Sequence, residues 1–486
     1  MIITHIRKMM NTISCTPRKM FLFSLAVLIL FYLPAFLCLY PGTLGYDGPA
    51  QLVMYYGEKP MTLHHPVFHT WLLGSLITAG QHLFGSLNAG LALYCAVQGI
   101  VVAVSLAGVF WFLRRYAVPF PVLAVMLLWT ACNPYLQAMT FTTTKDVLFS
   151  AFFLDFLMLL LLVQDETAGH QKAILILLGI MALLTCMTRN QGIYLVAGSF
   201  LFMLLLNRKW KVLAVLAGAV CCMLCINAVN THLLHFEKGD AREMLSVPMQ
   251  QEARVMHFRD AADITEEQEK MVLRVIPEEG LEQYDEWISD PVKNYVKTDE
   301  LKKDLPGYIR VYLQLGRQNP VVYWTAFDKM VSGFFRMSEM HAQAMTFTWT
   351  FTEYSERWGF HQEDRFHAYR RLLTGLIDPE TVHAGPFLNG IQPVLVIFQP
   401  VAAIVICAAA LALSLMRRRR SILIIGLLSG LYFVSMLLGP AALLRYALPL
   451  MMQVPLYVGL GFIMLFPGRR PAVIKEEDTE WTKQRS

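Results

Sequence analysis

Charged residues are scarce in this chain. Only 16% of the 486 residues are Asp, Glu, Lys or Arg, whereas 56% are hydrophobic and the mean hydropathy is +0.46. Soluble domains carry about 25% charged residues, so this shortage excludes an ordinary water-soluble protein. Apolar runs recur along the sequence, and each is long enough to cross the hydrocarbon core of a bilayer as a helix. The sequence therefore predicts an all-α, polytopic membrane protein.

Cysteine is absent from residues 231–388, the part of the chain that holds 26 of the 36 acidic residues. This absence excludes a disulfide framework within the segment. The segment also lacks the alternation of apolar and polar residues that is typical of strands, so we expect it to be mostly helical and water-facing. The nine cysteines lie in or beside apolar runs. Cys221–Cys225 could form a metal or redox site, but small residues that pack between membrane helices are the favoured interpretation.

The net charge of +5 does not indicate a nucleic-acid partner. The basic residues stand in short clusters beside apolar runs, as at Arg417–Arg420. Such clusters mark the cytoplasmic ends of spanning helices. The partner that they predict is the lipid bilayer of the cell (plasma) membrane.

The apolar run near the N-terminus resembles a signal peptide, but it continues to Tyr40 without a cleavage site and predicts an uncleaved first span at about 20–40. The positive-inside rule then places both termini in the cytoplasm and residues 231–389 outside. Further spans are expected at 89–113, 117–134, 147–163, 172–188, 191–206, 211–230, 390–416, 421–438 and 446–466. The predicted bundle thus has about ten spanning helices, or ten to eleven if one more apolar stretch crosses.

That additional stretch is 66–84. If it crossed, Arg114 and Arg115 would face outward, so a re-entrant or interface-lying helix is preferred. The chain is accordingly divided into an N-terminal membrane module (1–230) with a first outer loop (41–88), a mostly helical extracytoplasmic segment (231–389), C-terminal membrane helices (390–466) and a cytoplasmic tail (467–486).

Four groups of polar residues fall on the outer side of this topology. The first surrounds Asp47, which glycines and prolines hold in a turn just after the first span, and a short helix is expected from Pro49. A carboxylate placed there can act as a general base. The alternative is an Asx turn or a helix N-cap, which local sequence alone favours.

The second group is His64, His65 and His69. His65 and His69 are four residues apart and would share one face of a helix, which could make a metal pair. No Glu stands between them in the manner of metalloprotease motifs. Binding of a phosphate or of sugar hydroxyls is preferred to metal binding, and simple interface-seeking side chains are the remaining alternative.

The third group is Thr142–Asp146, between the spans expected at 117–134 and 147–163. Lys145 can meet a phosphate as a point charge, and Asp146 can orient a hydroxyl or bind a cation. A capped helix start explains the same residue types. Both interpretations can hold together, since a helix N-terminus also favours anions.

The fourth group contains two arginines at the membrane edge, in Arg189-Asn190 and Arg445-Tyr446. Arginine binds phosphate through a two-pronged fork, although it can also extend to lipid headgroups in general. Outward-facing arginines are unusual under the positive-inside rule, and this placement favours a functional role for them.

Together these motifs resemble the GT-C superfamily of membrane glycosyltransferases, whose members include protein O-mannosyltransferases, the lipid A aminoarabinose transferase and oligosaccharyltransferases. Members share an acidic residue and a short surface helix in the first outer loop, here Tyr46-Asp47 to Gln51. His64-His65-Pro66 leads to Phe84-Gly85, as in bacterial members. Asp146 matches a second acidic residue in a later outer loop, and Arg445, Tyr446 and Pro449 match a late Arg-Tyr-x-x-Pro motif. The combination is also similar to an uncharacterised bacterial family of polytopic membrane proteins.

The resemblance implies a GT-C-like bundle and an inverting glycosyltransferase. It would use a polyprenyl-phosphate-linked sugar on the outer face to modify a cell-envelope glycan, lipid or protein. Asp47 and Asp146 would be catalytic, and the substrate would be bound by Tyr46, Gln51, His64, His65, Lys145, Arg189, Asn190, Arg445 and Tyr446.

Two features depart from the pattern. Residues 231–389 precede the last three spans, whereas GT-C enzymes often place a soluble domain at the C-terminus. Asp47 has no adjacent acidic partner, so a divalent metal is possible but not favoured, and no other cofactor is implied. A transporter or flippase for a lipid-linked precursor, or an assembly partner for envelope polymers, remains the alternative.

Overall fold

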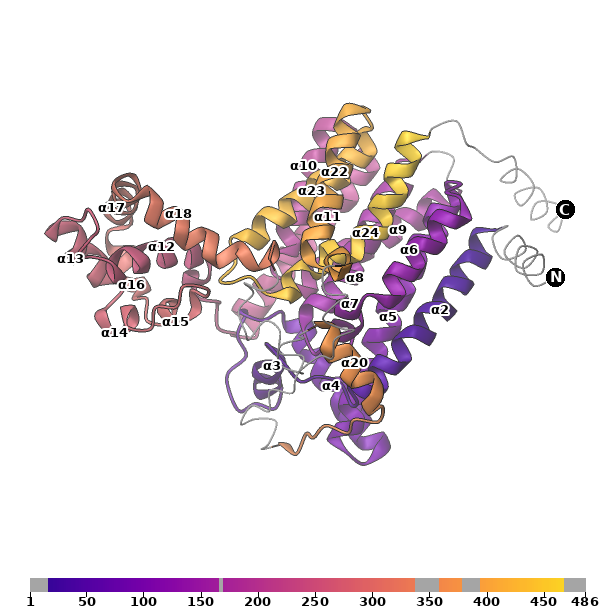
Figure 1. Cartoon of the computed structure of the whole chain (residues 1–486), viewed down its shortest axis with the longest axis horizontal. Helices are drawn as coiled ribbons and strands as arrows, with labels where there is room; N and C mark the ends of the chain where they lie inside the picture. The colour runs from indigo at the N-terminus through magenta and orange to yellow at the C-terminus, as the bar shows by residue number, and fades with distance from the viewer. Residues whose placement is uncertain (1–15, 166–168, 337–357, 378–393, 467–486) are drawn as a thin grey trace.

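The computed structural model describes residues 16–165, 169–336, 358–377 and 394–466, and every regular element in these ranges is a helix. β-pairing in the same ranges is confined to three isolated bridges. A large apolar bundle carries a smaller helical lobe on one side (Figure 1). The prediction of an all-helical protein is confirmed.

The bundle is built from helices that coincide with the apolar runs of the sequence. They are α2 (Pro17–Cys38), α4 (Val67–Phe84), α5 (Leu87–Arg115), α6 (Phe120–Cys132), α7 (Pro134–Thr140), α8 (Lys145–Leu162), α9 (Gln171–Thr188), α10 (Gly192–Leu206), α11 (Trp210–Ala228), α22 (Pro400–Met416), α23 (Arg420–Leu437) and α24 (Leu444–Leu465). A π-helical turn, Val229–Leu233, extends α11.

Six of these helices are long and apolar enough to cross a membrane within the described ranges, and a seventh span results if the bent pair α6–α7 counts as one. The six are α2, α5, α9, α11 with its π-helical turn, α23 and α24. The chain is therefore a multi-pass membrane protein. The remaining three predicted spans correspond to α8, α10 and α22. The total of about ten spans, the cytoplasmic placement of the termini and the placement of α4 in the membrane stay predictions.

The span expected at 117–134 corresponds to α6, and a second helix, α7, follows it after a bend of 56° at Asn133-Pro134. Proline has no N–H for a continuing helix, and the Asn133 side chain accepts from the backbone N–H groups of Tyr135 and Leu136 as a new N-cap. The short helix α7 thus carries the chain to the loop that begins α8.

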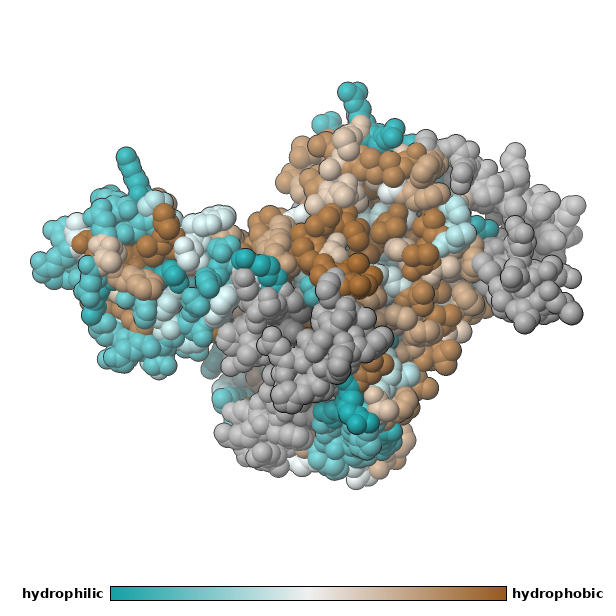
Figure 2. All heavy atoms as spheres, viewed as in Figure 1, coloured by the Kyte–Doolittle hydropathy of each residue, from teal (hydrophilic) through white to brown (hydrophobic). Residues whose placement is uncertain are grey.

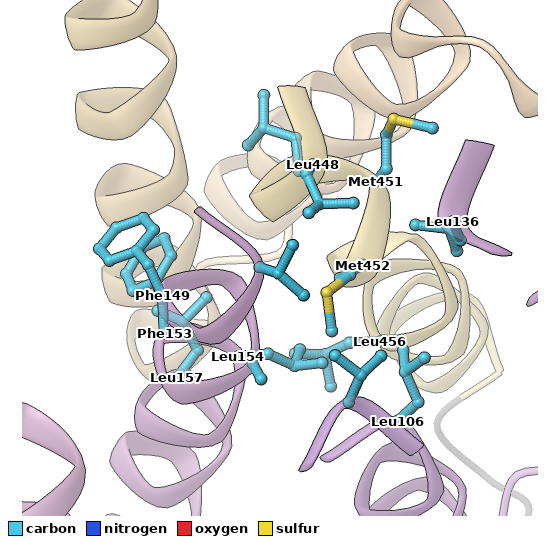
Figure 3. Close-up of a cluster of buried hydrophobic side chains, with 14 of the residues drawn as sticks. Leu106, Leu136, Phe149, Phe153, Leu154, Leu157, Leu448, Met451, Met452 and Leu456 are labelled. Atoms are coloured by element: carbon cyan, nitrogen blue, oxygen red, sulfur yellow. The ribbon is translucent and has the colours of Figure 1, made fainter. Parts of the chain in front are cut away.

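The core of the bundle lies where α5, α7, α8 and α24 meet (Figure 3). Helix α24 is buried over most of its length, even though Pro449 and Pro455 interrupt its backbone hydrogen bonding. Large side chains from α8 and α24 fill the space between these helices, including Phe149, Phe153, Leu448 and Met452.

The lobe has its own hydrophobic core, centred on α12. Its helices are α12 (Ser246–His257), α13 (Glu266–Val275), α14 (Glu278–Leu281), α15 (Asp290–Lys293), α16 (Thr298–Lys303), α17 (Leu305–Gln318) and α18 (Pro320–Val331). The 3-10 turns Ala241–Leu245 and Ser332–Phe334 flank it. At the start of α13, Thr265 and Gln268 form a reciprocal capping box, which fixes the helix terminus.

Part of the predicted extracytoplasmic segment belongs to the bundle rather than to the lobe. The stretch before α20 (His367–Ile377) runs along the end of α2, where the Arg365 N–H donates to the Leu37 carbonyl at 3.1 Å and the Glu363 N–H donates to the Tyr40 carbonyl at 3.0 Å. A 3-10 turn, Val396–Phe398, precedes α22. The predicted cytoplasmic tail, 467–486, lies outside the described residues.

Candidate functional site

Backbone pairing joins the loop after α2 to the loop before α8. The Thr43 N–H donates to the Phe141 carbonyl at 2.8 Å, and the Thr143 N–H donates to the Thr43 carbonyl at 2.9 Å. The approach is close, because a Cβ on Gly48 would lie 2.5 Å from the Thr143 hydroxyl oxygen. This pairing places the turn that carries Asp47 beside the start of α8.

Asp47 stands at the N-terminus of α3 (Gly48–Tyr55), the short helix expected from the sequence. Its carboxylate makes no capping hydrogen bond to that helix, so the N-cap interpretation does not account for the side chain. The preceding residue, Tyr46, has a left-handed backbone with φ of 53°. This conformation is uncommon for a bulky residue and recurs at functional sites.

The Asp47 carboxylate is held by two cations from distant parts of the chain. One oxygen, Oδ2, accepts from Lys145 Nζ at 2.8 Å and from Arg445 Nη1 at 2.8 Å. Burial by itself raises the pKa of Asp47, but Arg445 and Lys145 outweigh it and hold the pKa well below its usual value. Asp47 is therefore ionised, and it is a weak base as long as both cations stay on it.

Asp146, at the start of α8, is completely buried. One carboxylate oxygen pairs with Arg189, and the other accepts from the Thr144 hydroxyl at 2.9 Å. Arg445 Nη1 lies 3.8 Å from that second oxygen, so a single arginine nitrogen contacts both aspartates. Thr144 is also the N-cap of α8. The capped helix start and the ion pairs thus coexist.

Arg445 begins α24, and its guanidinium lies between two aromatic rings. Its Cζ is 4.7 Å from the ring centre of Tyr46 and 4.9 Å from that of Tyr446. These cation–π contacts fix the plane of the guanidinium. Its Nε is buried and has no hydrogen-bond partner among the described residues. A buried donor of this kind is costly unless something accepts from it.

Arg189 follows the end of α9 and joins the same cluster. Besides Asp146, it donates to the Tyr432 hydroxyl at 3.1 Å. Its Cζ lies 4.9 Å from the ring centre of Tyr446 and 5.6 Å from that of Phe149. Tyr432 was not expected from the sequence, because a tyrosine within an apolar run has no pattern that separates it from a packing residue.

The histidines have different surroundings. His65 lies before α4 rather than in it, and its Nδ1 is 3.3 Å from Lys145 Nζ. Burial, with a contribution from Lys145, lowers the pKa of His65 to about 3, so the ring is neutral and can accept from Lys145. His64 is exposed. The Asn190 side chain donates to the carbonyls of Leu63 and His64, both at 3.1 Å, and thereby holds this loop.

Gln51 and His69 belong to a separate, buried network of hydrogen-bonded polar side chains. The His69 ring nitrogens lie 3.0 Å from Gln51 Oε1 and 2.8 Å from the Tyr94 hydroxyl. Tyr94 donates to Gln98 at 2.8 Å, and Gln98 donates to the backbone carbonyls of the loop before α8. This hydrogen-bond network connects α3 to that loop. His65 and His69 contact different partners and do not share the helix face that the metal-pair alternative required.

The structure therefore brings eight of the predicted site residues into one cluster: Tyr46, Asp47, His65, Lys145, Asp146, Arg189, Arg445 and Tyr446. Gln51, His64 and Asn190 lie around it and support its loops. Three cations face two carboxylates, an excess of one positive charge.

The residues of the cluster do not fit a divalent cation. Within the described ranges no group of three or more His, Cys, Asp or Glu side chains is arranged to hold a metal. Each carboxylate is paired with an arginine or a lysine instead. An excess of cations with an unpartnered N–H suits an anion.

The chain belongs to a family of unknown function, DUF6020, whose model matches residues 57–479. No curated protein matches it in sequence. Among solved structures, ArnT from Cupriavidus metallidurans bound to undecaprenyl phosphate is similar at 14% identity and a TM-score of 0.34, over 89% of this chain and 77% of that one.

Proposed function

We propose that this protein is an inverting membrane glycosyltransferase that takes a sugar from a polyprenyl-phosphate donor on the outer face and passes it to a cell-envelope acceptor. The observation that carries the proposal is the cluster of Lys145, Arg189 and Arg445 around Asp47 and Asp146. The polyprenyl part of the donor comes from the resemblance of the motifs to GT-C transferases.

A phosphate group matches the charge and the donors of this cluster. Arg445 is held by two tyrosine rings and has an unpartnered Nε–H, and Lys145 is oriented by neutral His65. Arginine and lysine together bind phosphate strongly through charge-assisted hydrogen bonds. The excess positive charge would compensate the negative charge of the donor.

Binding of phosphate would change the state of Asp47. Lys145 and Arg445 are its partners in the ligand-free site, and the phosphate would compete for both. As these cations turn to the phosphate, the pKa of Asp47 rises toward its usual range, because the charges that depressed it now face another anion. The carboxylate then becomes a better base at the moment when the donor is in place.

The chemical step is a single displacement. The acceptor hydroxyl oxygen forms a bond to the anomeric carbon of the sugar, and the bond from that carbon to the phosphate oxygen breaks. The hydroxyl proton passes to Asp47, and polyprenyl phosphate leaves with its charge stabilised by Lys145 and Arg445. Asp146 is fully buried, and we assign it the role of positioning Arg189 and Arg445 rather than of contacting the acceptor.

The test uses purified protein and a polyprenyl phosphate that carries a radiolabelled hexose, with donor binding and sugar release measured separately. Lys145→Met should weaken donor binding about 10- to 100-fold, the loss expected for one charged hydrogen bond. Lys238→Met, at an exposed lysine outside the cluster, is the matched control.

A wild-type protein that binds the labelled donor and moves it across the bilayer without releasing sugar would identify a flippase instead. Donor binding that is unchanged in Lys145→Met would contradict the phosphate site itself.

A further inference from the structure

The lobe exposes an apolar face on α17 and α18. On α17, Leu305, Ile309 and Leu313 follow one another at four-residue spacing and are 46%, 47% and 63% exposed. On α18, Val321 and Trp324 are 75% and 66% exposed. These five residues are called the apolar face below. Residues at this spacing form one stripe along a helix.

This face is additional to the one that folds the lobe. The adjacent side of α17 supplies Tyr308 and Leu315 to the lobe core, where both are buried. The apolar surface of the helix is therefore wider than the single face that a surface helix buries. Apolar side chains gather at this end of the lobe, whose surface is otherwise largely hydrophilic (Figure 2). An exposed apolar patch indicates a contact with a partner or a membrane.

The position of α18 favours the membrane. Its C-terminal end enters the bundle, because Val331 and Phe334 belong to the bundle core. Directly after it, the ring of Phe335 packs edge-on against Phe433 of α23, with centroids 6.5 Å apart. Since α23 is a candidate span, this end of α18 is fixed beside a membrane helix.

The apolar face also lies on the side of the lobe that a contact with the bilayer requires. In Figure 1, α17 and α18 form the side of the lobe nearer the α22–α23 tip, and α14 and α15 form the opposite side near the level of α3. The bilayer surrounds the bundle between that tip and the α3 end. The side of the lobe that holds the apolar face is therefore turned toward the bilayer surface.

The positive charge of two arginines on α17 is also consistent with a position at the membrane surface. Arg310 and Arg317 are exposed and border the stripe, and neither has an ion-pair partner among the described residues. An interfacial helix typically has apolar residues inserted and arginines extended to anionic headgroups. Tryptophan prefers the same interface, which suits Trp324.

We propose that the apolar face rests on the leaflet at the α3 end of the bundle, the outer leaflet in the predicted topology, with Arg310 and Arg317 among anionic lipid headgroups. The lobe is then held against the membrane at two places, the Phe335–Phe433 contact and the apolar face. This contact does not depend on the glycosyltransferase activity and would persist in a protein of another function.

The experiment places single copies of the full chain in lipid nanodiscs, so that no second copy can cover the face. Leu313→Cys is compared with Glu282→Cys, an exposed position beside α14 on the opposite side of the lobe. Residues 231–388 contain no native cysteine, and the unsubstituted protein gives the background. The reaction rate of each cysteine with a charged, membrane-impermeant maleimide is measured in nanodiscs and again after the monomeric protein has been solubilised in detergent.

We expect Leu313→Cys to react several-fold more slowly than Glu282→Cys in nanodiscs that contain phosphatidylglycerol. A change to phosphatidylcholine alone should reduce the protection, because the arginines lose their anionic partners. Equal rates at both positions in both lipids would overturn the proposal. Protection that appears only when several copies share one disc would also overturn it, and would assign the face to a second copy.

Discussion

The ion cluster and the lobe each bury a carboxyl group completely, but in opposite surroundings. Asp146 lies at the start of α8 against Arg189, with Arg445 close by. Glu252, in the middle of α12, has no cation beside it; one oxygen bonds to the Tyr308 hydroxyl, and the other has no partner among the described residues. Burial raises the pKa of Glu252 to about 8, and the bond from Tyr308 offsets only part of this effect.

The difference shows that partners, and not burial alone, decide the state of a buried acid. A carboxyl group without a cation takes a proton, because the charged form cannot be solvated. A buried carboxyl group that lies against arginines forms ion pairs with them instead. The first arrangement belongs to a folded core, and the second keeps fixed charges together at the ion cluster.

The largest effect is expected from breaking the ionic arrangement. Asp146→Ala leaves Arg189 buried without its carboxylate and removes the second contact of Arg445, which should lower the free energy of unfolding by about 3–5 kcal/mol. Thermal melting in detergent measures the loss. Asp299→Ala, which removes an exposed ion pair with Lys302, should barely change the melting temperature. Equal melting of Asp146→Ala and the unsubstituted protein would show that the buried pair does not stabilise the fold.

A smaller effect on stability is expected from Glu252, the buried acid of the lobe. The pKa of Glu252 is raised from 4.5 to about 8 in the folded protein, so its contribution to stability is full below about pH 4.5 and is lost as the pH rises to about 8. Glu252→Gln mimics the neutral acid and should remove this decline, melting at higher temperature than the unsubstituted protein near pH 8.

Melting curves across this pH range check the prediction. The exposed control Glu282→Gln should keep the decline. Identical pH profiles for Glu252→Gln and the unsubstituted protein would assign the decline to other groups.

The helices and the polar loop residues could be predicted because both depend on local sequence. Apolar length marks the bundle helices, and Asp47, Lys145 and Arg445 stand out because charge is rare beside such runs. Their pairing could not be predicted in the same way. Asp47 and Arg445 are 398 positions apart, and no spacing rule connects them.

Other features depend on tertiary context. Tyr432 is one aromatic residue among many in an apolar run, and only its contact with Arg189 distinguishes it. Glu252 looks like any surface acid until the core of the lobe closes around it. The bend at Pro134 was open to prediction from the proline, but the direction in which it sends α7 depends on packing against its neighbours.

In the proposed function, Asp47 occupies two cations, Lys145 and Arg445, that a donor phosphate would take. The most direct measurement is the affinity of the purified protein for polyprenyl phosphate, with Asp47→Asn compared with the unsubstituted protein and with Glu282→Gln as the charge-matched control. Asp47→Asn removes the competing anion while keeping the shape of the side chain, so the dissociation constant should fall even as sugar transfer slows by about 10²–10⁴-fold. Weaker or unchanged binding in Asp47→Asn would contradict the account.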